Sequence, residues 1–392
     1  MAEAVTPFKV QIPDSELELL RKKLELARLP DYEGCEWGEE AEGGVTSGLM
    51  RETVDHWRTK YDWRAAEARM NEMPQYKTSI PIDGFDAVNV HFVHAKPADP
   101  AAAAGPPTPL LFLHGWPGSF IEVQEMLPRL LAAGFHVVAP SLAGFGFSGY
   151  PRQAGFQLTH QAEMMNRLMA RLGYGSYLVQ GGDWGSLLGR IMAVRYPKHV
   201  KALHLNMIFS SGPNGQKWPP ADEELTPREQ RCVDRAKFFQ TKNSAYQALQ
   251  ATKPRTVGYA FHDSPLGMLA WMADKVLIWS DPKAKAWTPD ELITWTLLHY
   301  FPGPTTGMVT YRENDFAWVL ELLSSEEPGC KVPLGLSQFP EEMVFSPRRV
   351  LEADYKNLAW MREHDAGGHF AASEKPEELA TDMIDFFGSY RK

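Results

Sequence analysis

The sequence predicts an α/β fold in which helices flank a mostly parallel central sheet. Short apolar runs recur along the middle of the chain, and each is followed by a glycine turn and a helical pattern. This repetition of strand, turn and helix is typical of a sheet whose parallel strands are joined by helices. Two further observations are a helical insertion late in the chain and a helical segment at its start. We therefore expect one elaborated core with an N-terminal arm and a lid.

The composition excludes several classes of protein. Hydrophobic residues make up 44% of the 392 residues and charged residues 23%, as in an ordinary folded chain. The net charge of −9 makes nucleic acid and anionic membrane surfaces unlikely partners. Three distant cysteines without metal-ligand spacing favour a reducing compartment and predict no metal site. Since we find neither a signal peptide nor an apolar stretch that could span a membrane, we expect a cytoplasmic protein.

Residues 1–75 are predicted to form a helical arm. They are rich in Leu, Glu, Arg and Trp, and Leu17, Leu20 and Leu24 fall on one face of a helix. No polar cluster in this segment suggests chemistry. We therefore expect the arm to pack against the main domain.

Residues 76–211 are predicted to form the first part of the core. The segment opens with alternating apolar positions around Asp83-Gly84, a dipeptide suited to the tight turn of a β-hairpin. After a loop rich in alanine and proline, short apolar runs follow that predict the strands of the parallel sheet. These runs lie at residues 110–113, 136–139 and 177–179.

Residues 212–308 are predicted to form a helical lid. The stretch is rich in Trp, Met and Leu, and Trp271, Trp279 and Trp295 predict an apolar pocket beneath it. Long insertions in parallel sheets lie above the carboxyl ends of the strands, where ligands bind. A lid over a binding site is the expected result.

Residues 309–392 are predicted to form the second part of the core. Strand-like and helical segments resume near Val344 and end at Phe387. This second part is expected to complete the sheet.

The strongest local signal is the segment Gly-Gly-Asp-Trp-Gly at residues 181–185. It follows a predicted strand and precedes a helical segment, which is the layout of a nucleophile elbow in the α/β-hydrolase fold. The turn is so sharp that side chains two positions either side of the nucleophile would collide, which explains Gly181 and Gly185. Its centre, Asp183, is a carboxylate that can attack without a base. The alternative interpretation is that Asp183 caps the following helix.

A second glycine turn, His-Gly-Trp-Pro-Gly-Ser at residues 114–119, follows the first predicted parallel strand. In the α/β-hydrolase fold this position supplies a backbone donor to an oxyanion hole. The amides of Trp116 and Trp184 are therefore the predicted pair of donors. We interpret His114 as structural. The alternative is an ordinary turn of glycine and proline.

An ester on Asp183 can be removed only by an activated water, and the side chain that titrates near neutral pH is histidine. His369 is the candidate base, because it lies in the loop Asp-Ala-Gly-Gly-His-Phe shortly before a terminal helix. That is the last place in the fold's order of nucleophile, acid and histidine. His364 is the local rival. The acid is expected in the loop before it, where chain order leaves Glu341 and Glu342 both open.

Together these motifs resemble those of the microsomal-type epoxide hydrolases, and more closely those of their soluble fungal members. The resemblance rests on His-Gly-Trp-Pro-Gly-Ser, Gly-Gly-Asp-Trp-Gly-Ser and Gly-Gly-His-Phe-Ala-Ala, and it covers nearly the whole chain, including the arm. It implies an enzyme that converts epoxides to vicinal diols without a metal or an organic cofactor. The family pattern Phe-Pro-x-Asp/Glu places the partner of the histidine at Glu342. The membrane anchor of the microsomal enzymes has no counterpart before Phe8.

The resemblance also implies two acids, Tyr246 and Tyr311, because their sequence contexts match those of two family tyrosines that hold and protonate the epoxide oxygen. Spacing alone would not have singled them out. A phenol with a pKa near 10 can donate a proton to the alkoxide that ring opening creates. The implied reactants are a small apolar epoxide and water, and a homodimer is a family-level expectation.

Two other functions stay open from the sequence. A haloalkane dehalogenase shares the aspartate nucleophile and the histidine but stabilises a departing halide, so the two tyrosines favour the epoxide. A hydrolase-fold binding protein without turnover is the other alternative. The presence of Asp183, Glu342 and His369 argues against it.

Overall fold

The computed structural model describes residues 4–30, 43–99, 104–210, 219, 224–326 and 330–391. Within these ranges a nine-stranded sheet forms the centre of the molecule, in the order β1-β2-β3-β5-β4-β6-β7-β8-β9. The strands are β1 (Thr6–Phe8), β2 (Gln75–Ile82), β3 (Phe85–Ala95), β4 (Thr108–Leu113), β5 (Phe135–Pro140), β6 (Tyr177–Gly181), β7 (Val200–Leu205), β8 (Leu334–Gln338) and β9 (Leu358–Glu363).

The sheet is antiparallel at one edge and parallel elsewhere. Strands β1, β2, β3 and β5 pair antiparallel, whereas β5, β4, β6, β7, β8 and β9 pair parallel. The hairpin between β2 and β3 turns at Asp83-Gly84, where Gly84 has a φ of 85° that favours glycine. The predicted hairpin and the three predicted parallel strands are all present, and the predicted fold class is confirmed.

The return to the sheet after the lid differs from the prediction. The strand predicted near Val344 lies instead at β8, and Val344 follows it in an irregular segment. Pro333 and Gly335 interrupt the apolar run of β8 in the sequence and hide it. The run around Val344 is apolar for another reason, because Met343 and Phe345 are buried while Val344 lines a cavity described below.

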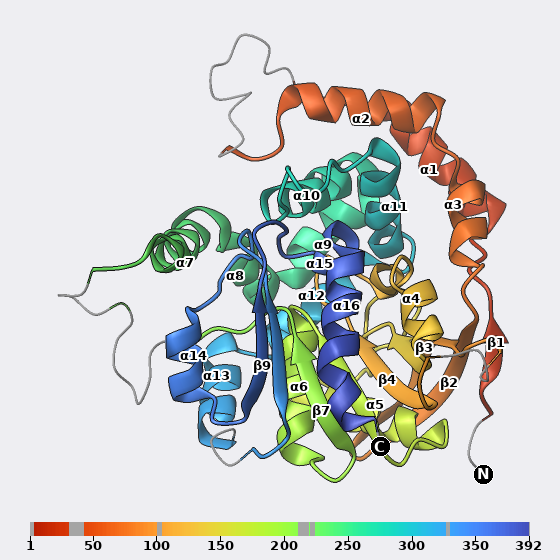
Figure 1. The fold of residues 1–392 in the computed structure, drawn as a ribbon. Helices are drawn as coiled ribbons and strands as arrows, with labels where there is room; N and C mark the ends of the chain where they lie inside the picture. Colours follow the sequence, from red (N-terminus) through yellow and green to blue (C-terminus); the bar gives the residue numbers. More distant parts are fainter. Residues whose placement is uncertain are drawn as a thin grey trace.

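The N-terminal arm runs along the outside of the molecule (Figure 1). Its helices are α1 (Asp14–Leu26), α2 (Ser47–Thr59) and α3 (Trp63–Met70). Helix α1 contacts α10 and α2 contacts α11, so the arm packs on the lid as well as on the core, and β1 extends the sheet. Leu20 and Leu24 are buried on the inner face of α1, as the spacing predicts.

The lid helices lie above the carboxyl ends of the parallel strands (Figure 1). In the described chain, α7, α9, α10, α11 and α12 each begin at a proline, a residue that suits the first turn of a helix because its missing N–H has no partner there. Helix α12 runs across residue 308, where the sequence places the end of the lid, and the division into domains stays a prediction. The lid elements are α7 (Pro227–Phe238), the π-helix η5 (Phe239–Asn243), α8 (Ala245–Thr252), α9 (Pro254–Asp263), α10 (Pro265–Ile278), α11 (Pro289–Tyr300) and α12 (Pro304–Glu313).

Helices cover both faces of the sheet. These helices are η3 (Phe120–Val123), α4 (Leu127–Ala132), α5 (Leu158–Arg171), α6 (Trp184–Arg195), α13 (Phe316–Glu326), α14 (Arg348–Asp354), α15 (Ala371–Glu374), α16 (Pro376–Phe387) and η7 (Gly388–Tyr390). One of them, α16, is tied to strands of the sheet by a polar network around the buried Asp382.

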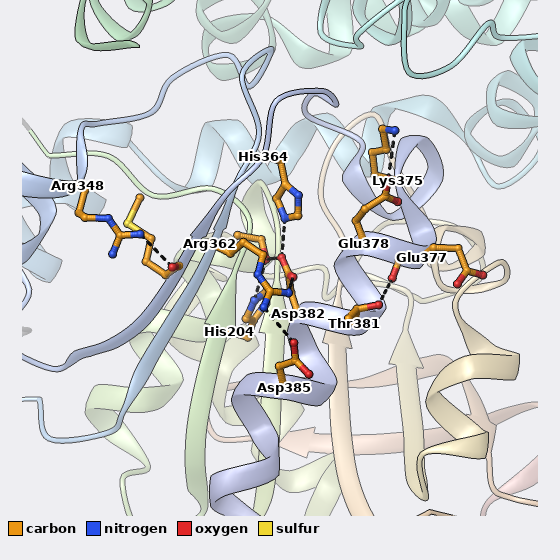
Figure 2. A network of polar contacts seen from close by, with 12 residues as sticks. His204, Arg348, Arg362, His364, Lys375, Glu377, Glu378, Thr381, Asp382 and Asp385 are labelled. Atoms are coloured by element: carbon orange, nitrogen blue, oxygen red, sulfur yellow. Dashed lines mark hydrogen bonds and ion pairs between the residues drawn. The ribbon is translucent and has the colours of Figure 1, made fainter. Parts of the chain in front are cut away.

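Figure 2 shows Asp382 of α16 between Arg362 and His364. Its carboxylate accepts hydrogen bonds from Arg362 at 2.5 Å and from Ser337, and lies 2.6 Å from Nε2 of His364. Burial raises the pKa of Asp382, but His364, Ser337 and His204 outweigh burial and lower it. His364 is therefore engaged in holding α16 to β8 and β9, and it does not reach the predicted site.

Candidate active site

Asp183 lies at the tip of the turn between β6 and α6. Its φ of 49° is the one positive φ of a non-glycine residue in the described part of the chain, a strained conformation that typically costs about 1–3 kcal/mol. A Cβ at Gly181 would lie 2.2 Å from the carbonyl oxygen of Gly185, and a Cβ at Gly185 would lie 2.2 Å from that of Leu113. The two glycines are thus required by the turn, as the sequence predicts.

The side chain of Asp183 points back to the oxyanion loop and not to the helix that follows. Its Oδ1 accepts a hydrogen bond of 2.7 Å from the amide of Trp116. It makes no capping hydrogen bond to the described residues of α6, so the alternative of a helix cap is wrong. Burial raises the pKa of Asp183, while His369 and the amides of Trp116 and Trp184 oppose that rise.

His369 lies between two carboxylates. Its Nδ1 is 2.7 Å from Oε1 of Glu342, and its Nε2 is 3.6 Å from Oδ2 of Asp183. Burial disfavours the charged ring, but Glu342 first of all, then Asp183 and Glu122, outweigh burial and raise the pKa of His369 to about 9. Glu341 instead pairs with Arg235 at 3.4 Å and with a second arginine of α7. The structure therefore separates the two glutamates that chain order leaves open.

The loop of His369 is held by the lid. The amide of His369 donates to the carbonyl of Trp279 at 2.9 Å. The side chain of Asp281 accepts from the amide of Gly367 at 2.8 Å, and Glu374 accepts from the amides of Asp281 and Phe370 at 2.7 and 2.9 Å. We call Asp281 and Glu374 the loop clamp. Burial raises the pKa of Glu374 to about 7.

Tyr246 of α8 and Tyr311 of α12 meet above Asp183. Both are buried, and their ring centroids lie 5.8 Å apart. Tyr246 stacks on Trp116 at 4.9 Å, and Tyr311 packs edge-on against Trp184 at 4.9 Å. Burial above all raises the pKa of both phenols, with a further contribution from Asp183. Both hydroxyls therefore keep their protons at neutral pH and can donate them.

A cavity of about 390 Å³ connects these groups. Asp183, Tyr246 and Tyr311 line it, and most of the remaining wall is apolar, from Trp184, Leu187, Met207, Phe239, Met343 and Val344. The predicted lid tryptophans do not line this cavity. Trp279 lies behind its wall, in contact with Tyr246 and His369, whereas Trp295 packs on Phe370, next to His369 in the chain.

The loop that contains Trp116, one of the two predicted oxyanion donors, is held by hydrogen bonds of His114. His114 donates from Nδ1 to the carbonyl of Gly115 at 2.9 Å and accepts at Nε2 from the amide of Leu142 at 3.1 Å. Burial lowers its pKa to about 4, so the ring is neutral. These contacts agree with the predicted structural role of His114, and they place the Trp116 amide against Asp183.

Comparison with known proteins shows the family. A family model described as the epoxide hydrolase N terminus matches residues 5–123, and one for the alpha/beta hydrolase fold matches residues 108–260. A putative epoxide hydrolase of Stigmatella aurantiaca is 37% identical, with 99% of this chain and 86% of that protein covered. The chain belongs to the epoxide hydrolase family. Epoxide hydrolase 1 of Sus scrofa is 32% identical, with 98% of this chain and 89% of that protein covered.

Solved structures of epoxide hydrolases share the whole fold. The Aspergillus niger enzyme superposes with a TM-score of 0.85 at 32% identity, covering 99% of this chain and 97% of that one. The juvenile hormone epoxide hydrolase of Bombyx mori gives a TM-score of 0.86 at 30% identity, covering 99% and 95%. The predicted family and enzyme class are confirmed. Within the described ranges, no helix of this epoxide hydrolase is long and apolar enough to cross a membrane.

Sequence reasoning missed three carboxylates beside the site. Glu122 lies near His369 and Asp183, and Asp281 and Glu374 form the loop clamp. Of the three, only Glu122 belongs to a recognisable sequence pattern, because Ser119 and Glu122 form the Ser-x-x-Glu pattern of a capping box. That pattern indicates a helix start and says nothing of a neighbouring histidine.

Proposed function

We propose that this epoxide hydrolase converts small apolar epoxides to vicinal diols through a covalent ester on Asp183. The observation that carries the proposal is that Asp183, Tyr246 and Tyr311 line one apolar cavity. An epoxide bound there meets a carboxylate and two phenols that remain protonated. The apolar wall supports an apolar substrate.

In the first step, Asp183 attacks an oxirane carbon. Its Oδ1 is held by the amide of Trp116, so the other oxygen, Oδ2, is the nucleophile. One C–O bond forms, the ring C–O bond breaks, and Tyr246 or Tyr311 gives a proton to the departing oxygen. The product is a hydroxyalkyl ester of Asp183.

In the second step, water cleaves the ester. His369, oriented by Glu342, takes a proton from water, and the resulting hydroxide adds to the carbonyl carbon of Asp183. The oxyanion forms on Oδ1, where the amides of Trp116 and Trp184 stabilise it by roughly 3–4 kcal/mol per donor. The bond between the carbonyl carbon and Oδ2 then breaks, the leaving oxygen takes the proton of the added hydroxyl, and the diol departs. The proton on His369 restores the tyrosine pair. Each cycle consumes one epoxide and one water.

A single turnover in water enriched in ¹⁸O tests this route. The hydroxide oxygen ends in the carboxylate of Asp183, so the first diol is unlabelled and the peptide that contains Asp183 gains the label. Mass spectrometry of both products measures this. Label in the first diol, with none in Asp183, contradicts the ester.

A panel of aryl and alkyl epoxides with chiral analysis of the diols defines the substrate. The cavity predicts that apolar epoxides are turned over and that charged ones are not. The cytoplasmic location and the homodimer predicted from the sequence stay predictions.

A further inference from the structure

A second, much smaller cavity adjoins Asp183 and His369. Its volume is about 20 Å³, and a single water needs about 10–15 Å³ measured in this way. Of the residues that line it, only Asp183 also lines the substrate cavity. Asp183 therefore separates a space for the substrate from a space for one water.

The small cavity contains an acceptor that lacks a donor. Gln180 is buried, and its Nε2 donates to Asn206 at 2.8 Å, but its Oε1 has no hydrogen-bond partner in the part of the chain that the structure describes. Leaving a buried acceptor unsatisfied costs about 1–3 kcal/mol. A water molecule in the cavity that both residues line would supply the missing donor.

Glu122 also lines this cavity, and the steps above do not use it. One oxygen, Oε1, accepts from the amide of Ser119 at 3.1 Å. The carboxylate reaches this place because residue 118 is a glycine, since a Cβ at Gly118 would lie 1.8 Å from Glu122 Oε1. Burial raises the pKa of Glu122 to about 8, and the charge of His369 opposes that rise. The carboxyl group and the imidazole therefore interact electrostatically.

We propose that the small cavity holds the water that hydrolyses the ester, and that Glu122 binds this water beside His369. The water gives one hydrogen to Nε2 of His369 and the other to Glu122, which leaves a lone pair for the carbonyl carbon of Asp183. His369 removes the proton, and Glu122 holds the molecule in place without a net proton transfer. This inference rests on the ester route proposed above.

The substitution Glu122→Gln tests the role of the carboxylate. Glutamine keeps the size and the acceptor for the Ser119 amide but replaces the second, water-binding oxygen with an NH₂ group that can only donate. With a saturating epoxide in rapid-quench experiments, we expect ester formation within about twofold of the wild-type rate and ester hydrolysis slower by about tenfold or more, because the attacking water is misplaced. The covalent ester then accumulates and is detected by intact-protein mass. Glu125→Gln is the matched control, since Glu125 forms an exposed pair with Arg69 in the same segment.

A second variant displaces the carboxylate of Glu122 without replacing this residue. In Gly118→Ala the new Cβ displaces Glu122 from the cavity, and we expect the same selective loss of ester hydrolysis. Equal slowing of both steps in both variants indicates a merely structural role and overturns the proposal, as does wild-type hydrolysis in Glu122→Gln. An experimental structure in which the cavity is dry overturns it even if both variants fail to fold. Absence of any covalent ester in the wild type contradicts the ester route itself. This outcome is therefore distinguishable from a failure of the role proposed for Glu122 alone.

Discussion

At the scale of single residues, the charge of Asp183 contributes, after that of Glu342, to the raised pKa of His369. The pKa of His369 is about 9, raised against burial by Glu342 and then by Asp183 and Glu122. On the proposed route Asp183 loses its charge when it becomes an ester, and one of the causes of that rise disappears. The pKa of His369 then falls, so the ring becomes a competent base in the step that needs one.

The substitution Asp183→Asn mimics the uncharged ester and tests this coupling. Removal of a neighbouring negative charge destabilises the imidazolium, so we expect a lower pKa of His369 than in the wild type. An NMR titration of the His369 ring proton measures it. An unchanged or higher value contradicts the coupling. Asp315→Asn is the control, because Asp315 is exposed at the far rim of the substrate cavity.

At the same scale, Tyr246 and Tyr311 are the proposed proton donors in ring opening. Loss of one proton donor is expected to slow ester formation on the order of 10²-fold, and replacement of both with Phe by 10³-fold or more, within the usual range of general acid catalysis. Single-turnover ester formation is the measurement. If the double variant still released halide from a haloalkane, the dehalogenase alternative would regain support. Tyr259→Phe, which alters an exposed lid tyrosine, leaves the rate unchanged.

At the scale of elements, local signals were predictable and contacts between distant elements were not. The elbow at Asp183 depends on Gly181 and Gly185, which are close to it in the chain, so the local sequence was sufficient to predict it. Tyr246 and Tyr311 acquire their role from packing on Trp116 and Trp184, which lie far away in the chain, and only the family resemblance revealed them. The strand β8 was misplaced because its short apolar run contains proline and glycine.

The loop clamp is the contact between elements that most directly affects the base. In Asp281→Ala the amide of Gly367 loses its acceptor, so the loop of His369 loosens and ester hydrolysis slows by about tenfold. The free energy of unfolding falls by about 1–3 kcal/mol, because a buried donor is left unsatisfied. Stopped-flow kinetics and urea denaturation measure the two effects. Asp263→Ala, at an exposed ion pair with Lys23, serves as the control; equal effects in both variants would count against the clamp.

At the scale of the whole molecule, buried histidines in separate elements determine how the fold responds to acid. They are His91, His114, His204 and His299. Burial lowers the pKa of His91 to about 3 and that of the other three to about 4, whereas in the unfolded chain each titrates near 6.5. Between about pH 6.5 and pH 4 the unfolded chain therefore binds protons that the folded protein does not. These four histidines therefore lower the free energy of unfolding as the pH drops through this window, against an opposite contribution from Glu122 and Glu374, whose pKa values burial raises to about 8 and about 7.

His369 acts in the opposite direction. Its folded pKa of about 9 is raised, so its contribution to stability is complete below about pH 6.5 and is lost as the pH rises to about 9. These histidines alone predict a stability maximum near neutral pH, between the loss caused by the four neutral histidines and the loss caused by His369. Thermal unfolding measured from pH 4 to pH 9 should show this maximum.

The substitution His91→Gln isolates one histidine of the acid limb. His91 lies 2.9 Å from Oγ of Ser141 and 3.0 Å from Oε1 of Gln75, and an amide can accept from the first and donate to the second. The variant should therefore fold, and the acid slope of its unfolding free energy should be shallower by up to about 1.4 kcal/mol per pH unit, the effect of one proton. His262→Gln, which alters an exposed histidine, should keep the full slope. If His91→Gln kept the full slope too, His91 would not contribute to the acid limb, and the contribution assigned to its burial would be wrong.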